Sequence, residues 1–451
     1  MLANRWCLVL FLLPMVLRGQ QKSDLQQILE RLERLEQENH NLAAEVRLLR
    51  EELASSRTAT VPAETSAAAP IDERLAVQER RIDEQAQTKV EASQRLPITL
   101  TGMVLFNAYL NGRSNGGQEY PVAASAPSGN ALVGGATLRQ SVIGLKFQGP
   151  TVWGGGQING SLYLDLFAGS TSSLNHLVRL RVATIEIDWK NRSLMVGQDK
   201  PIVAPREPNS LAQVGVSPLT GAGNLWLWEP QIRYEERISL GRQAGLRLQA
   251  GVYQTSDPSY ISRGGDSTAI VPGPRPALEG RFEFWRQIGE SARIEIAPGF
   301  HTSSSHIAGV SVPSHLFTLD WLIQPISKIQ LTGAFFHGQN AAGIGGLHQG
   351  FTVFDDNRVI RPIGATGGWA QLSYLATKRL SFNLQGGQES DRGRDLLAND
   401  IQRNLMYAAN AIYRLGPNVL LGVEASQVRT NYFLGPSRLN NHYDVALGYL
   451  F

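Results

Sequence analysis

The chain has 451 residues, of which 42% are hydrophobic and 18% are charged, and its formal net charge is +3. So small a net charge does not indicate nucleic-acid binding, which needs a concentrated basic face. A single cysteine excludes a disulfide framework, and no apolar run beyond residue 20 approaches the ~18 residues of a membrane-spanning helix.

Residues 1–20 have the pattern of an export signal. Arg5 provides a positive start, residues 6–17 form a short apolar core, and a polar run follows. We expect a signal peptide over 1–20. An uncleaved membrane anchor is the alternative, because no clean small-residue cleavage site follows. Cys7 lies inside this segment, so we expect no thiol in the mature chain.

Residues 22–54 carry the heptad pattern of a coiled coil. The a and d positions are Leu25, Ile28, Leu32, Leu35, Asn39, Leu42, Val46, Leu49 and Leu53. The polar Asn39 at an a position fixes register at some cost in stability. The string "RLERLE", with Arg31 at g and Glu36 at e, is similar to a known trimerisation signature. We therefore expect a parallel homotrimer. The alternative is an amphipathic helix that packs on its own protein.

Two further segments lead from this helix to the main part of the chain. Residues 55–70 are rich in Ala, Thr, Ser and Pro, a composition typical of a linker. Residues 71–96 have a poorer apolar seam at Leu75, Ile82 and Val90. We expect them to form a second helical segment that extends the stalk weakly.

From Pro97 onward the period of the apolar residues changes to two, which is the signature of half-buried strands. Leu278, Phe282 and Phe284, for example, alternate with charged residues. About sixteen such segments follow one another, and they begin near Ile98, Leu138, Gln157, Arg181, Ser193, Leu225, Gly245, Ala277, Ala292, His315, Lys328, Gly367, Lys378, Arg403, Asn418 and Leu439. Short turns alternate with long polar connections.

This pattern predicts an all-β fold, an antiparallel transmembrane β-barrel of about sixteen strands over residues 97–451. Its polar rows would line a wet interior and its apolar rows would face lipid. A soluble sandwich or propeller is the weaker alternative, because the strands are too many for one sandwich and show no blade-length repeat. Between Arg181 and Trp189 the apolar parity slips, which indicates a β-bulge.

The segment after the fifth predicted strand is unusual. Five prolines between Lys200 and Pro230 exclude a regular strand or a long helix. Its apolar residues, such as Ile202, Val203 and Leu211, need cover. A connection that is both long and apolar should pack on something.

The strings "GQDKPIVAP" and "LTGAGNLWLWEPQIRY" flank this segment and, with the overall architecture, resemble the DcaP-like family of trimeric outer-membrane porins and related environmental porins. In sixteen-stranded porins the loop between strands five and six folds into the barrel, which implies a pore-constricting loop at about 200–224. The resemblance also implies a Gram-negative outer membrane, a periplasmic coiled coil, a homotrimer and passive diffusion of small hydrophilic, often anionic organic solutes. We expect no cofactor and no metal. The alternative function is a structural anchor that tethers the outer membrane through the coiled coil.

The predicted pore-lining residues come from this loop and from neighbouring polar rows. They are Lys200, Arg206, Glu207, Asn209, Arg233, Glu235, Arg247, Arg281 and Arg293. An excess of arginine beside a few acids would favour anionic or dipolar solutes. The alternative is that these charges form salt bridges that brace the wall.

The C-terminal segment 441–451 continues the apolar row to Tyr449 and Phe451. By resemblance, these two aromatic residues form the signal by which the barrel assembly machinery recognises its clients. We expect the last strand to pair with the first, so that no edge faces lipid.

We do not expect an enzyme. The eight histidines show no H-E-x-x-H spacing. His301 and His306 flank "TSSS" in what is predicted to be a surface loop, and a Ser/His site there is the weaker interpretation. The adjacent Asp355 and Asp356 leave cation binding at a loop tip as an alternative to two solvated acids.

Overall fold

The computed structural model describes residues 97–127, 132–168, 176–258, 270–272, 275–307, 310–347, 350–354 and 359–451. The predicted signal peptide, coiled coil, linker and second helical segment lie outside these residues, and so do Asp355 and Asp356. No helix in the described ranges is long and apolar enough to cross a bilayer.

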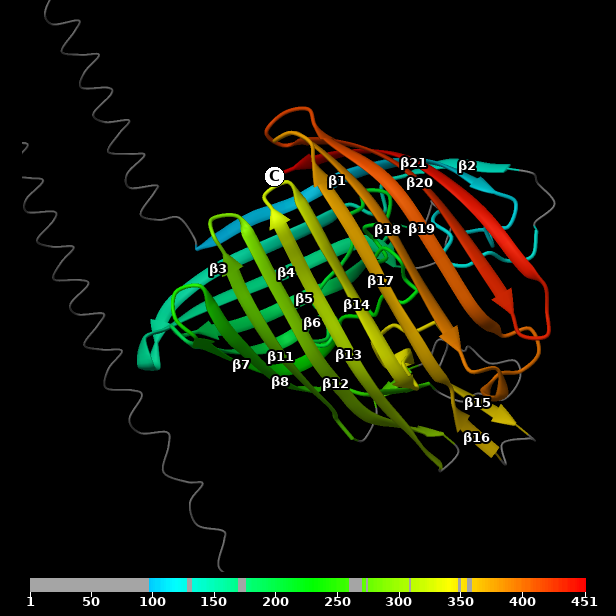
Figure 1. Cartoon of the computed structure of the whole chain (residues 1–451), viewed down its shortest axis with the longest axis horizontal. Helices are drawn as coiled ribbons and strands as arrows, with labels where there is room; N and C mark the ends of the chain where they lie inside the picture. Colours follow the sequence, from blue (N-terminus) through cyan, green and yellow to red (C-terminus); the bar gives the residue numbers. More distant parts are fainter. Residues whose placement is uncertain are drawn as a thin grey trace, which may run out of the picture. The chain divides into compact units, whose positions relative to one another are not determined.

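One antiparallel sheet of seventeen strands forms the body of the structure (Figure 1). Its strands are β1 (Ile98–Gly112), β2 (Leu132–Thr137), β3 (Val142–Val152), β4 (Gly156–Ala168), β5 (Leu177–Asp188), β6 (Arg192–Asp199), β7 (Glu229–Ser239), β8 (Ala244–Tyr253), β11 (Ala277–Ile288), β12 (Ala292–Ile307), β13 (Val310–Ile326), β14 (Ile329–Gln339), β17 (Gly364–Leu375), β18 (Leu380–Asp391), β19 (Ile401–Arg414), β20 (Val419–Tyr432) and β21 (Ser437–Leu450). The remaining elements are the hairpins β9 (Ser256–Pro258) with β10 (Ile270–Pro272) and β15 (Phe351–Phe354) with β16 (Val359–Pro362), and the short 3-10 helices η1 (Trp153–Gly155), η2 (Ala342–Ile344) and η3 (Gly393–Asp395).

The sheet closes into a barrel. β2 and β3 are successive segments along the same edge of β1, so they fill one position in the ring. The ring therefore has sixteen positions, as the sequence predicts. β21 pairs with the other edge of β1, from Met103 opposite Leu450 to Asn111 opposite His442, and the two strands lie side by side in Figure 1. β2 pairs with β1 alone, and every other strand of the sheet has a neighbour on each side, so the ring is closed.

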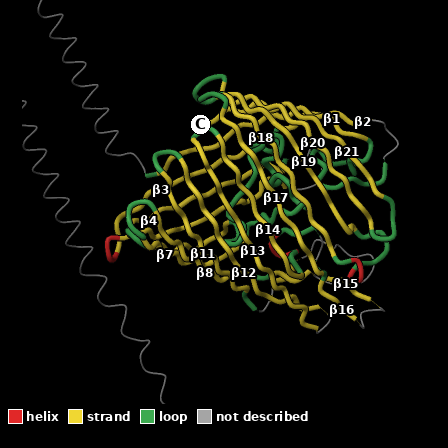
Figure 2. Tube along the Cα trace, in the orientation of Figure 1, coloured by secondary structure: helices red, strands yellow, loops and turns green. Residues whose placement is uncertain are grey.

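Short and long connections alternate around the ring, and Figure 2 shows them at the ends of the strands. At one end the strands are joined by tight turns at 153–155, 189–191, 240–243, 289–291, 327–328, 376–379 and 415–418. At the other end the connections include the long stretches 113–131, 200–228 and 340–363. We call these the short-turn end and the long-loop end. The predicted alternation of connections holds for most of the ring, but at the long-loop end β20 and β21 are joined by residues 433–436 alone.

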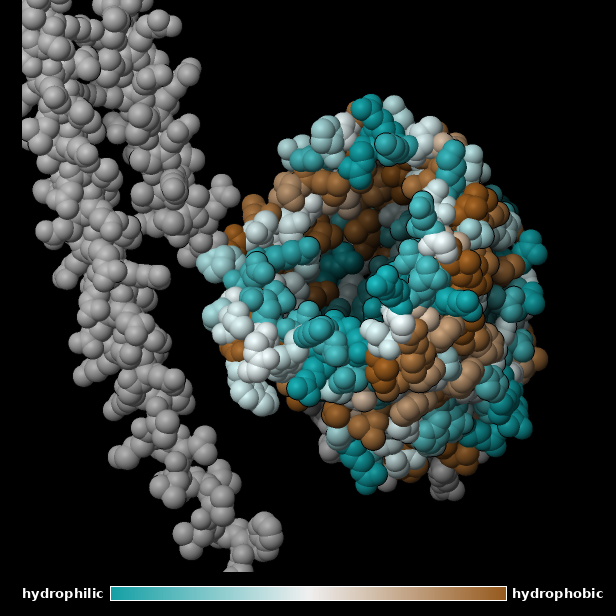
Figure 3. Space-filling view, turned by 60° about the vertical axis from the view of Figure 1, so that its left-hand side comes forward, coloured by the Kyte–Doolittle hydropathy of each residue, from teal (hydrophilic) through white to brown (hydrophobic). Residues whose placement is uncertain are grey.

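The two faces of the wall differ in polarity because successive side chains of a strand point to opposite faces. Along β21, Tyr443, Val445 and Leu447 are about half exposed, whereas Asp444 and Ala446 are buried. Hydrophobic residues cover large areas of the outer surface in Figure 3, and a hollow with hydrophilic residues opens between them. This arrangement is the reverse of a soluble protein, in which the apolar row is buried.

Several strand starts differ from the prediction by four or five residues, among them β5, which starts at Leu177 and not at Arg181, and β13, which starts at Val310 and not at His315. The second ring position does not start at Leu138, because the chain leaves the ladder at 138–141 and the Ser141 hydroxyl there accepts a hydrogen bond from Leu105 N at 2.9 Å. β7 starts at Glu229 and not at Leu225, because Leu225 is buried in an apolar cluster of the preceding loop. The predicted irregularity in β5 is confirmed, since the register slips so that Arg181 has no partner opposite it on β4.

Candidate functional site

The segment 200–228, between β6 and β7, is folded tightly against the wall of the barrel. Its polar groups bond to buried side chains on strands from several sides of the ring. The bonds run from Val203 N to Glu279 (3.4 Å), Asn209 N to Gln371 (3.1 Å), Ser210 Oγ to Glu424 (2.6 Å), Val214 N to Gln140 (2.7 Å), Asn107 Nδ2 to Leu211 O (2.9 Å) and Asn404 Nδ2 to Gly221 O (2.9 Å). These partners belong to β1, β11, β17, β19, β20 and the link between β2 and β3.

The apolar residues of this segment are buried against other parts of the barrel, as the sequence predicts. Ala212, Leu219 and Ala222 pack in a buried cluster that also contains Tyr120, Ala124, Trp369, Met406 and Val428. Val203, Ala204 and Leu225 pack in a second cluster with Leu316, Phe336, Ala341, Ile344 and Ala365. Apolar anchors are therefore spread along the whole segment, and the polar residues 206–210 lie between the first two of them.

Arg206 connects the segment to a network of charges on β5, β7, β8, β11, β12 and β13. Its Nε donates to Asp320 at 2.7 Å and its Nη2 donates to Glu295 at 2.5 Å. Arg281 bonds to the same Asp320 (2.7 and 2.8 Å) and to Glu283 (2.6 Å). The structure thus gathers charges from a loop and from neighbouring strands at one place.

The remaining predicted charges of this wall join the same network, which we call the arginine–carboxylate network. Arg247 lies 3.4 Å from Glu283 and 3.6 Å from Glu235, and Arg293 contacts Glu295. Glu235 also lies 3.7 Å from Arg237, which pairs with Asp188. The network holds Arg206, Arg237, Arg247, Arg281 and Arg293 against Asp188, Glu235, Glu283, Glu295 and Asp320. Five cations face five carboxylates, so its formal charge is zero. The arginine excess expected from the sequence is absent here.

Three predicted residues of the loop and one of β7 lie outside this network. Lys200 pairs with Glu207, whose carboxylate also accepts a hydrogen bond from Ser217 Oγ at 2.9 Å. Burial opposes the ionised form of Glu207, but Lys200 and Ser217 outweigh it and lower its pKa below the usual 4.5. Asn209 bonds to Gln371. Arg233 pairs with Asp199 at 3.2 Å.

A second group of arginines was missed in the sequence. Arg139, Arg179 and Arg181 surround Phe167 and Trp228, with guanidinium carbons 4.7 to 5.4 Å from ring centroids. Arg179 bonds to Asp165 at 2.6 and 3.1 Å, Arg181 lies 3.7 Å from the same carboxylate, and Arg139 pairs with Glu119 at 3.3 Å. We call this the aromatic–arginine group. Three cations against two carboxylates leave it a formal charge of +1. Arg179 and Arg181 alternate with apolar residues in "LVRLRV", and that alternation could have identified them.

Residues 113–127 form a second connection that binds the inner wall, which the sequence did not indicate. Tyr120 OH donates to Glu424 at 3.1 Å, and Ala124 N donates to Thr430 Oγ1 at 2.8 Å. Burial raises the pKa of the Glu119 carboxyl, although Arg139 acts in the opposite direction. Burial and the nearby Glu424 also raise the pKa of Tyr120 well above its usual value.

The structure places the Ser/His sequence in a strand and not in a loop. His301 lies on β12, with Nδ1 2.8 Å from Glu279 and Nε2 3.0 Å from Ser303 Oγ. Acyl transfer also needs free donors for an oxyanion, but β12 pairs with β11 and β13 on its two sides. The string "GRSNG" at 112–116 has G-x-S-x-G spacing, yet it ends β1 in a turn and no helix follows it. These features do not assemble an acyl-transfer site.

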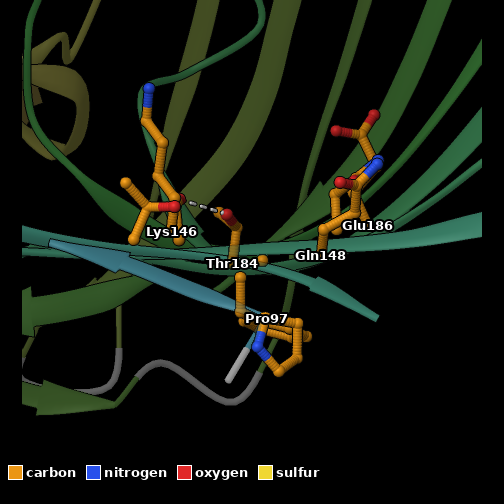
Figure 4. A pocket seen from close by; sticks show the side chains of 10 residues that line it. Pro97, Lys146, Gln148, Thr184 and Glu186 are labelled. Carbon is orange, nitrogen blue, oxygen red and sulfur yellow. Dashed lines mark hydrogen bonds between the residues drawn. The ribbon is translucent and has the colours of Figure 1, made fainter. Parts of the chain in front are cut away.

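At the short-turn end, a cavity of about 470 Å³ borders the wall formed by β1, β3, β4 and β5. Figure 4 shows Lys146, Gln148, Thr184 and Glu186 on one side of the sheet, with Pro97 on the other. Thr184 Oγ1 lies 2.7 Å from Ser161 Oγ. The lining of this cavity is mostly polar.

A closed sixteen-strand barrel with an apolar outer face and a charged, hydrogen-bonded interior has the architecture of the outer-membrane porins. No family model and no curated protein matches the sequence. Among solved structures, the outer-membrane channel DcaP of Acinetobacter baumannii is similar over 78% of this chain and 97% of that chain, with 18% identity and a TM-score of 0.64. An anion-selective porin from Comamonas acidovorans is similar over 78% and 99%, with 12% identity and a TM-score of 0.52. The chain therefore has the porin fold, and the resemblance predicted from the sequence is confirmed at that level.

Proposed function

We propose that this protein is an outer-membrane porin through which small hydrophilic solutes diffuse passively, and that the segment 200–224 narrows its lumen. The observation that carries the proposal is the set of hydrogen bonds from this segment to buried side chains on β1, β11, β17, β19 and β20. A loop that bonds to well-separated strands of a closed barrel has a short path only through the interior. Its charges would then face every solute that passes.

The proposed selectivity is for anionic organic solutes, and it rests on the aromatic–arginine group. The arginine–carboxylate network is balanced, so it contributes a local field but no net attraction for either sign. The +1 charge of the aromatic–arginine group attracts an anion at 4 Å by about 1 kcal/mol in water and about 4 kcal/mol at an effective dielectric constant of 20. Lys200 and Glu207 neutralise each other.

The assembly proposed for the chain is a homotrimer in the outer membrane of a Gram-negative type bacterium. Residues 22–54 would form a periplasmic coiled coil, with 55–70 as linker and 71–96 as stalk. Tyr449 and Phe451 would present the signal read by the barrel assembly machinery. The position of Phe451 supports the proposed assembly signal, because Phe451 lies at the short-turn end, where it exchanges backbone hydrogen bonds of 3.0 and 3.2 Å with Gly102.

Planar-bilayer recording tests the channel against the structural tether. A porin conducts, and trimeric pores close in three steps, whereas a tether with a plugged barrel shows no conductance. In a salt gradient, the double variant Arg179→Gln/Arg181→Gln should move the reversal potential toward cations. The matched variant Arg242→Gln/Arg286→Gln removes the same charge from exposed positions near the short-turn end and should move it less. Equal shifts of the reversal potential in the two double variants would show that the aromatic–arginine group does not determine the charge selectivity.

A further inference from the structure

A second cavity lies at the long-loop end, between the ends of β7, β8 and β12 and the residues that follow β14. Its volume is about 190 Å³, and its lining includes Glu229, Ser303, Ser305, Ser314, Asn340 and Gly343. Most of these groups are oxygen-bearing, and the described lining residues include no lysine or arginine. Its chemistry therefore differs from that of the aromatic–arginine group.

Glu229 is the charged group of this cavity that has no partner. Among the described residues, no ion pair and no side-chain hydrogen bond involves its carboxylate, and its charged neighbour is another acid, Glu279. Glu279 itself is engaged, because His301 Nδ1 lies 2.8 Å from it. An acid in such a place is stabilised by a cation that enters the cavity.

The neutral groups of the cavity present acceptors beside this carboxylate. Ser314 Oγ donates its hydrogen to Asn340 O at 2.7 Å, so its lone pairs remain available. Asn340 Nδ2 lies 3.3 Å from Ser305 Oγ and directs one of its donors there. An ammonium group has three donors and no acceptor, which matches one carboxylate beside several hydroxyl oxygens.

We propose that this cavity is a binding site for the ammonium group of small amine-bearing solutes, with Glu229 as the counter-ion and the serine hydroxyls as further acceptors. The site is separate from the aromatic–arginine group, to which the proposed function assigns the opposite charge. A solute that carries both an ammonium and a carboxylate would meet one site for each. This extends the range of solutes beyond the anions of the proposed function.

Titration calorimetry on the detergent-solubilised full-length protein tests the site without relying on conductance. The probe is n-butylammonium chloride at low ionic strength, with n-butanol as the neutral isostere. We expect saturable binding of the amine, at least tenfold weaker binding to Glu229→Gln, and no measurable binding of the alcohol. Glu290→Gln, which removes the same charge from an exposed turn at the opposite end, should bind as the wild type does.

A second variant tests the cavity independently of the charge. A Cβ added to Gly343 would meet no atom within 4 Å, so Gly343→Phe should fold and fill space beside Glu229. Gly416→Phe, also without a neighbour within 4 Å, is the control at the short-turn end. We expect Gly343→Phe to abolish binding and Gly416→Phe to leave it intact. Unchanged affinity in Glu229→Gln or Gly343→Phe, equal binding of the alcohol, or no saturable binding to the wild type would overturn the proposal.

Discussion

Replacing Arg206 with alanine removes the cation that ties the segment 200–228 to β12 and β13. Its guanidinium is 15% exposed and bonds to Asp320 and Glu295, which are 1% and 9% exposed. Breaking a buried ion pair costs about 3–5 kcal/mol. Here both carboxylates keep another arginine, since Arg281 still holds Asp320 and Arg293 still holds Glu295. We therefore expect the free energy of unfolding to fall by about 2 kcal/mol, the value of lost charged hydrogen bonds.

The same variant changes the charge of the arginine–carboxylate network from zero to −1. One unit charge at 4 Å is worth about 1 kcal/mol in water. It favours a cation and disfavours an anion by this amount, so the cation-to-anion permeability ratio changes by about 2 kcal/mol, or about thirtyfold. The shift should be largest at low salt and should fade toward 1 M, where the screening length is about 3 Å. Release of the loop should also raise the conductance. Reversal potentials and single-channel currents in planar bilayers measure both quantities.

Arg293→Ala is the matched control, because it removes the same charge from the same carboxylate, Glu295. Its side chain is 45% exposed, so its pair contributes about 0–1 kcal/mol. Both variants should shift the reversal potential toward cations. Arg206→Ala alone should lower the unfolding midpoint in urea and raise the conductance. If the two variants match in stability and conductance, Arg206 does not hold the loop.

Three further predictions concern the loop and the seam. Gly223 has φ +93°, and a Cβ there would lie 2.5 Å from Gln388 O and Gly368 O. Gly223→Ala should therefore lower the free energy of unfolding in urea by about 2–4 kcal/mol. The control Gly241→Ala, at φ +88° with no atom within 4 Å of the added Cβ, should lower it by about 1 kcal/mol. Similar losses in the two variants would contradict the close approach of the backbone to Gly223. The pKa of Glu207 is lowered in the folded protein, so its ionised carboxylate stabilises the fold above the usual pKa of 4.5, and this stabilisation is lost as pH falls through the folded-state pKa. The wild type should therefore lose more stability than Glu207→Gln between pH 7 and pH 3. Parallel curves of stability against pH for the two proteins would exclude this contribution. Phe451→Ala should reduce the fraction of heat-resistant folded protein in outer membranes more than Tyr374→Ala does. Equal reductions in the two variants would contradict a role of Phe451 in assembly.

The strands could be predicted from the sequence because the two faces of this wall meet different surroundings. Alternation such as that of Leu278, Phe282 and Phe284 with charged residues depends on the two faces and not on which strand lies beside it, although it is interrupted where the register slips in β5. The predicted strand boundaries are wrong where tertiary contacts of a side chain take the place of the hydrogen bonds between neighbouring strands. Leu225 looks like a strand residue, but it belongs to a buried loop cluster.

The net charge of the candidate site could not be predicted from the sequence in the same way. Arg281 was predicted to line the pore, but its main partner, Asp320, lies on β13, and a pairing of that kind depends on register across three strands. Without those acids the arginines looked like an excess of positive charge. The aromatic–arginine group shows the converse, because Arg139, Arg179 and Trp228 are far apart in sequence and meet only in the folded chain.

The seam between β1 and β21 determines the order in which the barrel is completed. Every other neighbouring pair in the ring joins strands that follow one another along the chain, whereas this pair joins residues near 103 and 450. Closing a flexible loop of that length costs about 5 kcal/mol in chain entropy. The free edge of β1 must therefore wait, unpaired, until the whole sheet has formed and curled, and during that interval it can pair with any other strand. A chaperone or a template strand that covers β1 would protect the nascent barrel at its most vulnerable edge.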